Sequence, residues 1–341
     1  MNNRNYHIDN IKAVLIFLVV FGHIIEPLTF HPKVKFIYLI IYSFHMPAFI
    51  FVSGYLCRLS KNKLRNVVKM LFLYIVMQVI YTHFTINVLE MPNTMQFYVP
   101  YWILWFLLAI AFYYTFVEFF DVTPFKIFLI IIIVLWVTGG NQLGYEYSLS
   151  RIVYFLPFFL IGYVVNQKNI ELTANIFARV FIFTAFIYLC YILISDIEII
   201  PLNWFYGVTG WNDVGVNQEV ALKTRIITYM FSALGILFIL AFVPRKKTII
   251  SYIGEYTLPI YLIHGFLVQY LNNKGTIYAE QTMKQCLITA IKYSMMIILV
   301  IVVSIYVYNY VKGYLDKKKS NGDLRVESIK SIKVYEDVEN F

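Results

Sequence analysis

Long apolar runs, separated by short polar segments, make up most of the chain. A helix that crosses the hydrocarbon core of a membrane needs roughly 20 mostly apolar residues. Ten runs approach or reach this length, and they predict an all-α, polytopic membrane protein with about ten transmembrane helices. The runs lie at residues 11–29, 36–57, 67–88, 102–120, 124–139, 151–166, 176–195, 226–243, 249–271 and 286–312. Glu255 and Pro259 interrupt the ninth run, so its continuity is the weakest part of this prediction.

The positive charges between these runs predict the orientation of the helices. If the N-terminus lies inside, 20 of the 28 Lys and Arg residues fall on the inner side of the membrane and eight on the outer side. Cytoplasmic segments of membrane proteins carry such an excess. We therefore expect both termini inside and an even number of helices. Residues 1–312 form the predicted membrane domain, and residues 313–341 form a charged cytoplasmic tail that we expect to be partly disordered.

Composition and charge agree with a membrane protein rather than a soluble one. Hydrophobic residues make up 60% of the chain and charged residues 14%, whereas soluble domains have roughly half and a quarter. The net charge of +9 is explained by the inner loops, so we expect no nucleic-acid partner and the lipid bilayer as the surroundings. The three cysteines have no paired spacing and no metal-ligand pattern, and are expected to be free thiols.

The longest predicted loop runs from residue 196 to residue 225 and falls on the outer side. It contains Trp204, Tyr206 and Trp211. Connecting loops of this length are either functional or disordered, and aromatic residues argue against disorder. We expect a cap or a re-entrant element here, through which an outer substrate enters.

The first predicted helix carries a stripe of polar residues. Lys12 and His23 are eleven residues apart, almost three helical turns, so they share one face and lie roughly 16 Å apart along the axis. Asp9 and Glu26 fall within about 60° of the same stripe. Polar groups at membrane depth usually face the interior of the bundle or water. The stripe therefore predicts a polar site beside this helix.

His45 on the second predicted helix lies at about the same membrane depth as His23. Histidine is the side chain best suited to proton transfer near neutral pH, so the two imidazoles form a candidate catalytic site. One alternative is that each histidine only hydrogen-bonds a neighbouring helix. A second alternative is a metal site, but no third ligand has the required spacing to either histidine, and we expect no metal.

Four further positions have two interpretations each. Arg58 and Lys61 either carry the usual inner positive charge or bind phosphate groups at the inner face. His264, two turns after Thr257 in the ninth run, is either a third polar group of the same cavity or a helix-packing residue. Arg151, at the start of the sixth run, either binds the oxygens of an acceptor or anchors the helix end.

These residues resemble the motifs of the integral-membrane acyltransferase 3 family, in particular its fucose 4-O-acetylase-like branch. The first helix of that family carries an Arg, ten residues and then a His, and here Lys12 stands in place of the Arg before His23. The resemblance covers roughly residues 6–312. The matching segments are Ile8–Lys12, Val19–His23, Ser43–Pro47, Ser53–Leu56, Trp105–Ala109, Phe155–Gly162 and Ile260–His264.

The resemblance implies transfer of an acyl group, in the first instance acetyl, from cytoplasmic acyl-CoA to a hydroxyl of a carbohydrate or cell-surface glycan. It makes His23 the leading catalytic residue and Lys12 a contact of the donor. Lys12 lacks the flat bidentate guanidinium of Arg, so it contacts the donor as a point charge. Either His23 or His45 would act as general base, and the other would orient the hydroxyl or donate to the oxyanion. An acyl-imidazole formed on His23 is the alternative path. Arg58 and Lys61 would hold the donor phosphates.

The same reasoning covers cofactors, partners and location. We expect no permanently bound cofactor, because acyl-CoA is a donor substrate. Cell-envelope biosynthesis proteins are the expected partners. A composition rich in Ile, Lys, Asn and Tyr is typical of AT-rich bacterial genomes, which favours a multi-pass protein of a bacterial cell membrane.

A polysaccharide exporter or another polytopic transporter is the alternative function. Polar residues near the midplane and a broken helix also suit transport, although no inverted repeat is evident in the sequence. A structural scaffold would not explain the buried polar stripe. Release of free thiol from acyl-CoA separates an acyltransferase from both.

Overall fold

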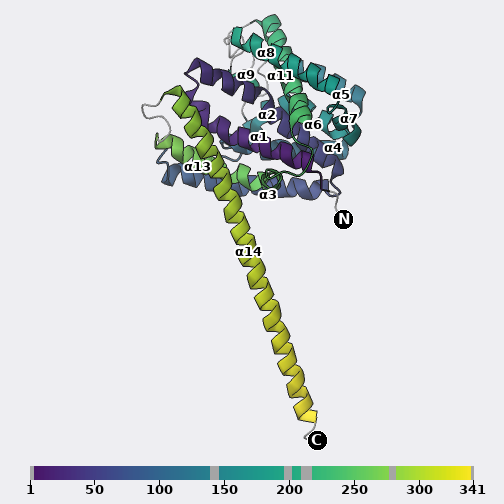
Figure 1. Cartoon of the computed structure of the whole chain (residues 1–341), viewed down its shortest axis with the longest axis vertical. Coiled ribbons are helices and arrows are strands. Elements are labelled where there is room, and N and C mark those ends of the chain that lie inside the picture. The colour runs from purple at the N-terminus through teal and green to yellow at the C-terminus, as the bar shows by residue number, and fades with distance from the viewer. Residues whose placement is uncertain (1–3, 139–145, 196–201, 209–216, 276–281, 339–341) are drawn as a thin grey trace.

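A computed structural model describes residues 4–138, 146–195, 202–208, 217–275 and 282–338. Within these residues the regular secondary structure is entirely helical, with no strand, which confirms the predicted all-α class. Figure 1 shows the helices gathered into one bundle, from which α14 projects. The longer helices are α1 (Tyr6–Ile25), α2 (Pro32–Leu59), α3 (Lys63–Asn87), α4 (Trp105–Phe119), α5 (Pro124–Val137), α6 (Leu149–Val164), α8 (Ile176–Ser195), α11 (Gln218–Phe242), α13 (Thr257–Asn273) and α14 (Met283–Val338).

Shorter helical pieces connect or cap these helices. The α-helical pieces are α7 (Gln167–Leu172), α9 (Leu202–Phe205) and α12 (Ser251–Glu255). The 3-10 pieces are η1 (Glu26–Leu28), η2 (Trp102–Leu104) and η3 (Glu146–Ser148). Of the long loop predicted over residues 196–225, the structure describes residues 202–208, which include α9, and residues 217–225, where α11 begins. Residues 196–201 and 209–216 lie outside the described residues, so the predicted cap is described only in part.

All ten predicted runs are helical, with differences at two of them. By length and hydropathy, eight helices within the described residues are able to cross a membrane, and the shorter Pro124–Val137 is apolar as well. The ninth run divides at Tyr256 into α12 and α13, close to the interruption predicted from Glu255 and Pro259. The eighth helix begins at Gln218 rather than at residue 226, because its first two turns are polar and an apolar-run criterion misses them.

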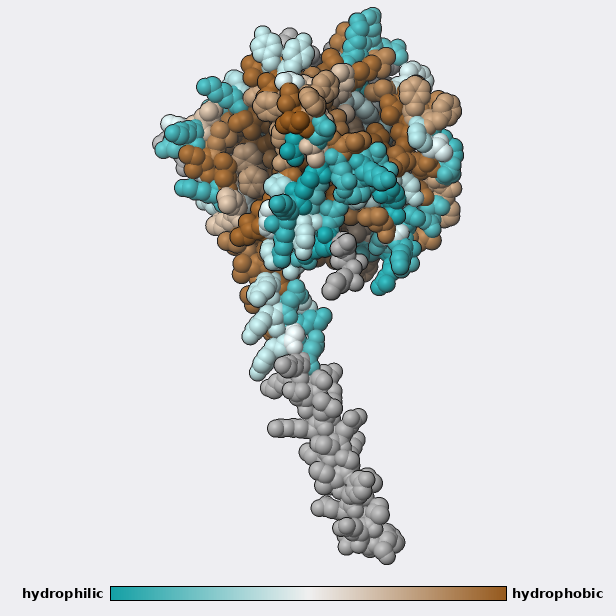
Figure 2. Space-filling view, turned by 45° about the vertical axis from the view of Figure 1, so that its right-hand side comes forward, coloured by the Kyte–Doolittle hydropathy of each residue, from teal (hydrophilic) through white to brown (hydrophobic). Residues whose placement is uncertain are grey.

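Large apolar side chains lie on the outer surface of the bundle. Phe177 is 82% exposed and Trp136 is 65% exposed. Such surfaces are stable in lipid but would favour aggregation in water. In Figure 2 apolar residues cover much of the visible face, and hydrophilic residues gather towards the end from which α14 projects. The backbone of α14 stays helical through Val338, and the proposed division of the chain at residue 312 stays a prediction.

Close contact between α2 and α6 builds the centre of the bundle. A Cβ on Gly54 would lie 2.1 Å from the carbonyl oxygen of Phe159, and a Cβ on Gly162 would lie 2.0 Å from that of Phe51. Small residues at such crossings let two membrane helices approach closely, which increases van der Waals contact. His45 in the middle of α2 and Arg151 near the start of α6 line the same cavity, so this crossing helps to position the site described below.

Candidate functional site

One face of α1 runs along two cavities. Lys12, Ile16, Val19 and His23 follow one another at helical spacing, and each lines one or both cavities. The prediction that Lys12 and His23 share a face is thereby confirmed. The two residues lie at opposite ends of this face, so the helix connects a site near Lys12 with a site near His23.

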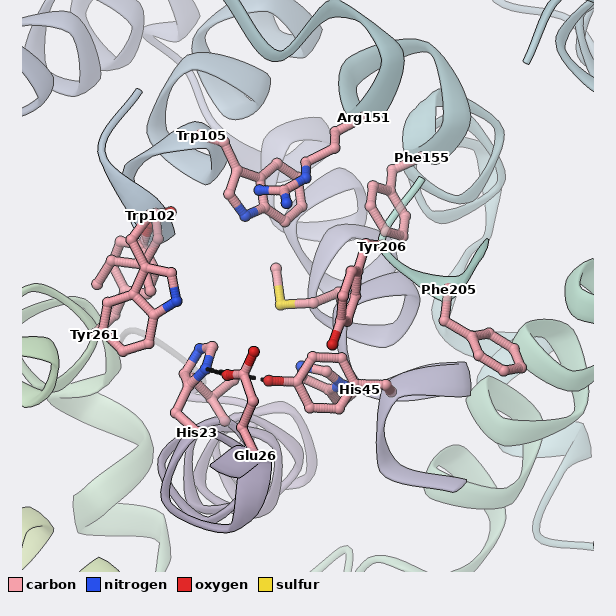
Figure 3. A pocket seen from close by; sticks show the side chains of 14 residues that line it. His23, Glu26, His45, Trp102, Trp105, Arg151, Phe155, Phe205, Tyr206 and Tyr261 are labelled. Atoms are coloured by element: carbon pink, nitrogen blue, oxygen red, sulfur yellow. Dashed lines mark hydrogen bonds and ion pairs between the residues drawn. The ribbon is translucent and has the colours of Figure 1, made fainter. Parts of the chain in front are cut away.

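The first cavity holds the two histidines that the sequence singled out. It has a volume of about 130 Å³, and Figure 3 shows His23, Glu26, His45 and Arg151 around it. The structure thus brings these four predicted residues together. The remaining lining residues are mostly aromatic or apolar: Val19, Tyr42, Met46, Trp102, Ile103, Trp105, Phe155, Phe205, Tyr206 and Tyr261.

His23 is oriented by two oxygen atoms. Its Nδ1 lies 3.3 Å from Oε2 of Glu26 and 3.1 Å from the hydroxyl of Tyr42. Because a carboxylate only accepts hydrogen bonds, we assign the proton of His23 to Nδ1, from which the Tyr42 hydroxyl also accepts, and the lone pair to Nε2. A neutral imidazole held in this tautomer is suited to remove a proton through Nε2, and the carboxylate stabilises the imidazolium that forms.

His45 is fixed in the same tautomer by its own helix. Nδ1 of His45 lies 2.8 Å from the carbonyl oxygen of Ile41, one turn earlier. Because that carbonyl accepts the proton on Nδ1, Nε2 is left as a hydrogen-bond acceptor facing the cavity. The ring of Tyr42 lies 4.6 Å from the ring of His45 and 6.2 Å from that of His23, centre to centre, so it stands between the two histidines.

His264 belongs to the same cluster but packs behind His23. The two imidazole rings are stacked with their centres 5.7 Å apart, while the ring of Trp102 lies 4.5 Å from that of His23. Nδ1 of His264 is 2.7 Å from the carbonyl oxygen of Tyr261. His264 is fully buried and is not among the residues that line the first cavity. Its position therefore suits support of His23 more than contact with a substrate.

Arg151 lies across the first cavity from His23 (Figure 3). Its guanidinium lies 5.2 Å from the centre of the Trp105 ring, which fixes its orientation. The neighbouring Ser150 donates a hydrogen bond of 2.7 Å to the carbonyl of Gly207. Arg151 therefore places a positive charge in the cavity, and its helix end is also tied to the segment after α9.

A buried arginine that the sequence analysis did not single out holds the segment around α9. Arg225 of α11 is completely buried and donates hydrogen bonds to the carbonyls of Trp204, at 2.9 Å, and Thr138, at 3.2 Å. Its guanidinium also lies 4.3 Å from the centre of the Trp204 ring. Phe205 and Tyr206 follow Trp204 directly and line the first cavity. In the sequence, Arg225 looked like an ordinary loop charge.

The sequence analysis named Tyr206 only as part of the outer loop, and it did not single out Tyr42 or Trp102 of the aromatic lining. Tyr42 lies three residues before His45 on one helix, so helical spacing alone would have placed the two side chains near each other. Trp102 had no such signal. With 29 Tyr and 30 Phe in the chain, aromatic identity does not mark a site.

The second cavity extends from the first towards Lys12. It has a volume of about 250 Å³ and is almost entirely apolar. Its few polar side chains include Lys12, Ser53 and Thr257. The other lining residues are Ile16, Val19, Met46, Phe49, Val52, Leu56, Met70, Phe106, Ile110, Tyr114, Leu258 and Tyr261. The arrangement suits a slender, mostly apolar ligand with a polar end near Lys12.

Lys12 is part of a charged network at the beginning of α1. Its Nζ lies 2.9 Å from Oδ1 of Asp9, and the other oxygen of Asp9 lies 2.6 Å from Nε of Arg4. Arg4 also pairs with Glu255 at 2.6 Å, which ties α12 to α1. The Asp9 carboxylate raises the pKa of Arg4. Asp9 therefore positions Lys12 and neutralises part of its charge, as its place on the predicted stripe suggested.

The two other predicted donor contacts lie apart from Lys12. Lys61 lines an open groove together with Arg65 and Lys69, where three positive charges face solvent. Arg58 does not line this groove or either cavity, and its guanidinium lies 5.5 Å from the centre of the Tyr55 ring. The structure thus groups Lys61 with two further cations and leaves Arg58 outside that group.

The cysteines and the groups that could bind a metal were also part of the sequence predictions. Cys57, Cys190 and Cys286 are free, as predicted. Across the part of the chain that the structure describes, no group of three or more His, Cys, Asp or Glu side chains is arranged to hold a metal ion.

Comparison with known proteins identifies the family. Over 59 residues the chain is 41% identical to the nodulation protein NolL of Sinorhizobium fredii (strain NBRC 101917 / NGR234), a stretch that makes up 16% of each protein. No solved structure shows significant similarity to this chain. The model of the acyltransferase domain matches residues 5–309, which include both cavities and all the residues around them. This protein therefore belongs to the acyltransferase 3 family, whose members are membrane acyltransferases.

Proposed function

We propose that this acyltransferase moves an acetyl group from acetyl-CoA to a hydroxyl of a carbohydrate or cell-surface glycan. The observation that carries this proposal is the pair of cavities that meet inside the bundle, with Lys12 in one and the two histidines in the other. A donor that enters past Lys12 and an acceptor that enters past Tyr206 would meet at His23. The narrower resemblance to the fucose 4-O-acetylase-like branch stays a prediction.

The donor side fits the shape and charge of acyl-CoA. The open groove of Lys61, Arg65 and Lys69 would hold the phosphate groups, since Lys and Arg are the usual phosphate partners in proteins. The apolar second cavity would take the slender pantetheine arm. Lys12 lines the second cavity and would contact a polar group of the donor there. Because acyl-CoA is a cytoplasmic donor, the proposal puts the beginning of α1 on the cytoplasmic side of a bacterial cell membrane.

The acceptor side has polar and aromatic surfaces together. Aromatic rings such as Trp105 and Tyr206 offer flat faces for the apolar C–H faces of a sugar ring. Arg151 supplies hydrogen-bond donors to sugar oxygens, and Nε2 of His45 accepts a hydrogen bond from a sugar hydroxyl. An extracytoplasmic glycan, delivered with help from cell-envelope biosynthesis proteins, is the acceptor that this chemistry favours.

The transfer step follows from the tautomers of the two histidines. Nε2 of His23 takes the proton of the acceptor hydroxyl as its oxygen attacks the thioester carbonyl carbon, and Glu26 stabilises the imidazolium. The carbon–sulfur bond then breaks, and the proton passes from His23 to the leaving thiolate, which gives an ester and free CoA. His45 orients the hydroxyl but, with Nε2 unprotonated, does not stabilise the oxyanion. Tyr42 and Arg151 are the donors in the cavity that fit that role.

Thiol release tests this proposal directly. Purified full-length protein in lipid nanodiscs is given acetyl-CoA with and without pooled bacterial cell-wall glycans, and free thiol and ester-linked acetyl are measured. We expect glycan-stimulated thiol release that falls at least about 100-fold in His23→Ala, the loss typical of a general base. His83→Ala is the matched control, because His83 is exposed on α3 and lines neither cavity.

Two outcomes would contradict the proposal. Wild-type turnover in a folded His23→Ala protein would show that the chemistry does not use this histidine. Movement of glycan across the membrane without any thiol release would instead support the alternative of a polysaccharide exporter.

A further inference from the structure

Three side chains separate the two cavities while lining both of them. These are Val19, Met46 and Tyr261, which we call the junction. They come from α1, α2 and α13, so three helices meet here. Val19 lies one turn before His23, and Met46 directly follows His45. Any group that passes from the second cavity to the histidines must therefore pass beside these three side chains.

Two members of the junction are held firmly and the third is adaptable. Val19 is β-branched and 4% exposed, so its rotamer is restricted. Tyr261 is 9% exposed, and its hydroxyl donates a hydrogen bond to the carbonyl oxygen of Ile103, which fixes the ring. Met46 is only partly buried, and an unbranched thioether has three rotatable bonds. Met46 is therefore the member of the junction whose side chain can most readily move to open a path between the cavities.

The position of the junction limits the acyl group of a donor. For attack by a hydroxyl in the first cavity, the thioester carbonyl must reach His23, which leaves the sulfur near the junction. The acyl substituent then shares the first cavity, of about 130 Å³, with the acceptor hydroxyl, whereas the larger cavity of about 250 Å³ lies on the donor side. Aromatic side chains on most sides of the first cavity leave little room for a longer chain.

From this geometry we propose that the junction selects the acyl group, and that Met46 is the specificity-determining residue that restricts the enzyme to acetyl. The proposal rests on the proposed function, because it takes acyl-CoA as the donor. Replacing Met46 by a smaller residue opens space beside the thioester carbonyl, where the additional methylenes of a longer acyl chain fit. Replacing it by a larger residue closes the passage even to acetyl.

The test compares butyryl-CoA with acetyl-CoA as donors for full-length protein in nanodiscs, with pooled cell-wall glycans as acceptor. One methylene in a shaped apolar pocket changes kcat/KM roughly 10- to 200-fold. Because butyryl is two methylenes longer than acetyl, the wild-type enzyme is expected to prefer acetyl-CoA over butyryl-CoA by at least about 100-fold in kcat/KM. Met46→Ala should reduce this preference by at least about tenfold, and the volume-conserving Met46→Leu should keep it within about threefold.

Met70→Ala is the matched control. Met70 lines only the second cavity, on the donor side. The same Met-to-Ala change there is expected to alter the KM for both donors alike and to leave their ratio unchanged. If Met70→Ala relaxes the preference as much as Met46→Ala does, general loosening of the bundle explains the effect and the junction proposal is overturned.

The remaining outcomes separate this proposal from the proposed function. A preference for acetyl that is unchanged in an active Met46→Ala enzyme overturns the junction proposal and leaves the acyl-CoA reaction intact. If Met46→Ala does not fold, Met46→Phe is measured instead. In that variant acetyl transfer should fall while acetyl-CoA binding persists, and undiminished transfer overturns the proposal. Absence of turnover with either donor in the wild type refutes the proposed function itself.

Discussion

Replacement of Glu26 by Gln tests the assigned orientation of His23. The substitution keeps the size of the side chain but removes the negative charge that lies 3.3 Å from Nδ1 of His23. At this separation the interaction of a carboxylate with an imidazolium is about 1.3 kcal/mol in a water-like dielectric and about 5 kcal/mol at the effective dielectric of a protein surface. The Glu26 side chain is 40% exposed, so the value lies between these limits.

These limits set the expected change in rate. Each 1.36 kcal/mol of lost transition-state stabilisation lowers the rate about tenfold. With an intermediate value of about 2.7 kcal/mol, kcat for acyl transfer should fall about 100-fold in Glu26→Gln. The KM for acetyl-CoA should change little, because Glu26 lines the cavity away from Lys12. Steady-state thiol release in nanodiscs measures both parameters.

A matched control separates this effect from a general loss of charge. Glu219 is 77% exposed and pairs only locally, with Lys223, so Glu219→Gln should keep wild-type kcat within about twofold. Thermal unfolding of both variants checks that the bundle is intact. If Glu26→Gln keeps more than half of the wild-type kcat, the carboxylate does not orient His23 during catalysis, and the assigned tautomer has no basis.

Three further changes test other parts of the structure. Arg225→Met removes the hydrogen bonds to the carbonyls of Trp204 and Thr138, each worth about 1 kcal/mol. We expect a Tm several degrees lower in nanodiscs and a higher KM for the glycan, and an unchanged Tm would show that this anchor is dispensable. Gly54→Ala places a Cβ 2.1 Å from a carbonyl oxygen of α6, so it should destabilise the bundle by about 1–3 kcal/mol or more. Loss of folded protein on size-exclusion chromatography measures this effect, and a normal elution profile and Tm would contradict the close packing. Lys61→Ala should raise the KM for acetyl-CoA about two- to fivefold and leave kcat unchanged, because the loss corresponds to one exposed ion pair. An unaltered KM would show that the donor phosphates bind elsewhere.

The sequence by itself determined which segments are helices and which polar residues share a helix face. These properties are local: an apolar run long enough to cross a membrane forms a helix because lipid offers no other partner for its backbone. The period of 3.6 residues then places Lys12 and His23 on one side of α1. Antiparallel succession of two spans was enough to put His45 at the depth of His23. The sequence also indicated that Glu26 lies near His23 and that Asp9 lies near Lys12, since the two members of each pair are three residues apart on one helix.

Only the tertiary structure decided how these helices pack and what stands between them. The stacking of His264 against His23 and the burial of Arg225 against Trp204 join residues far apart in the chain. Apolar runs of a membrane helix look alike whether they face lipid or protein, so hydropathy does not reveal which faces meet. The junction of Val19, Met46 and Tyr261 has the same origin. Its members are ordinary apolar or aromatic residues in the sequence, and they acquire a role because three helices converge beside the histidines.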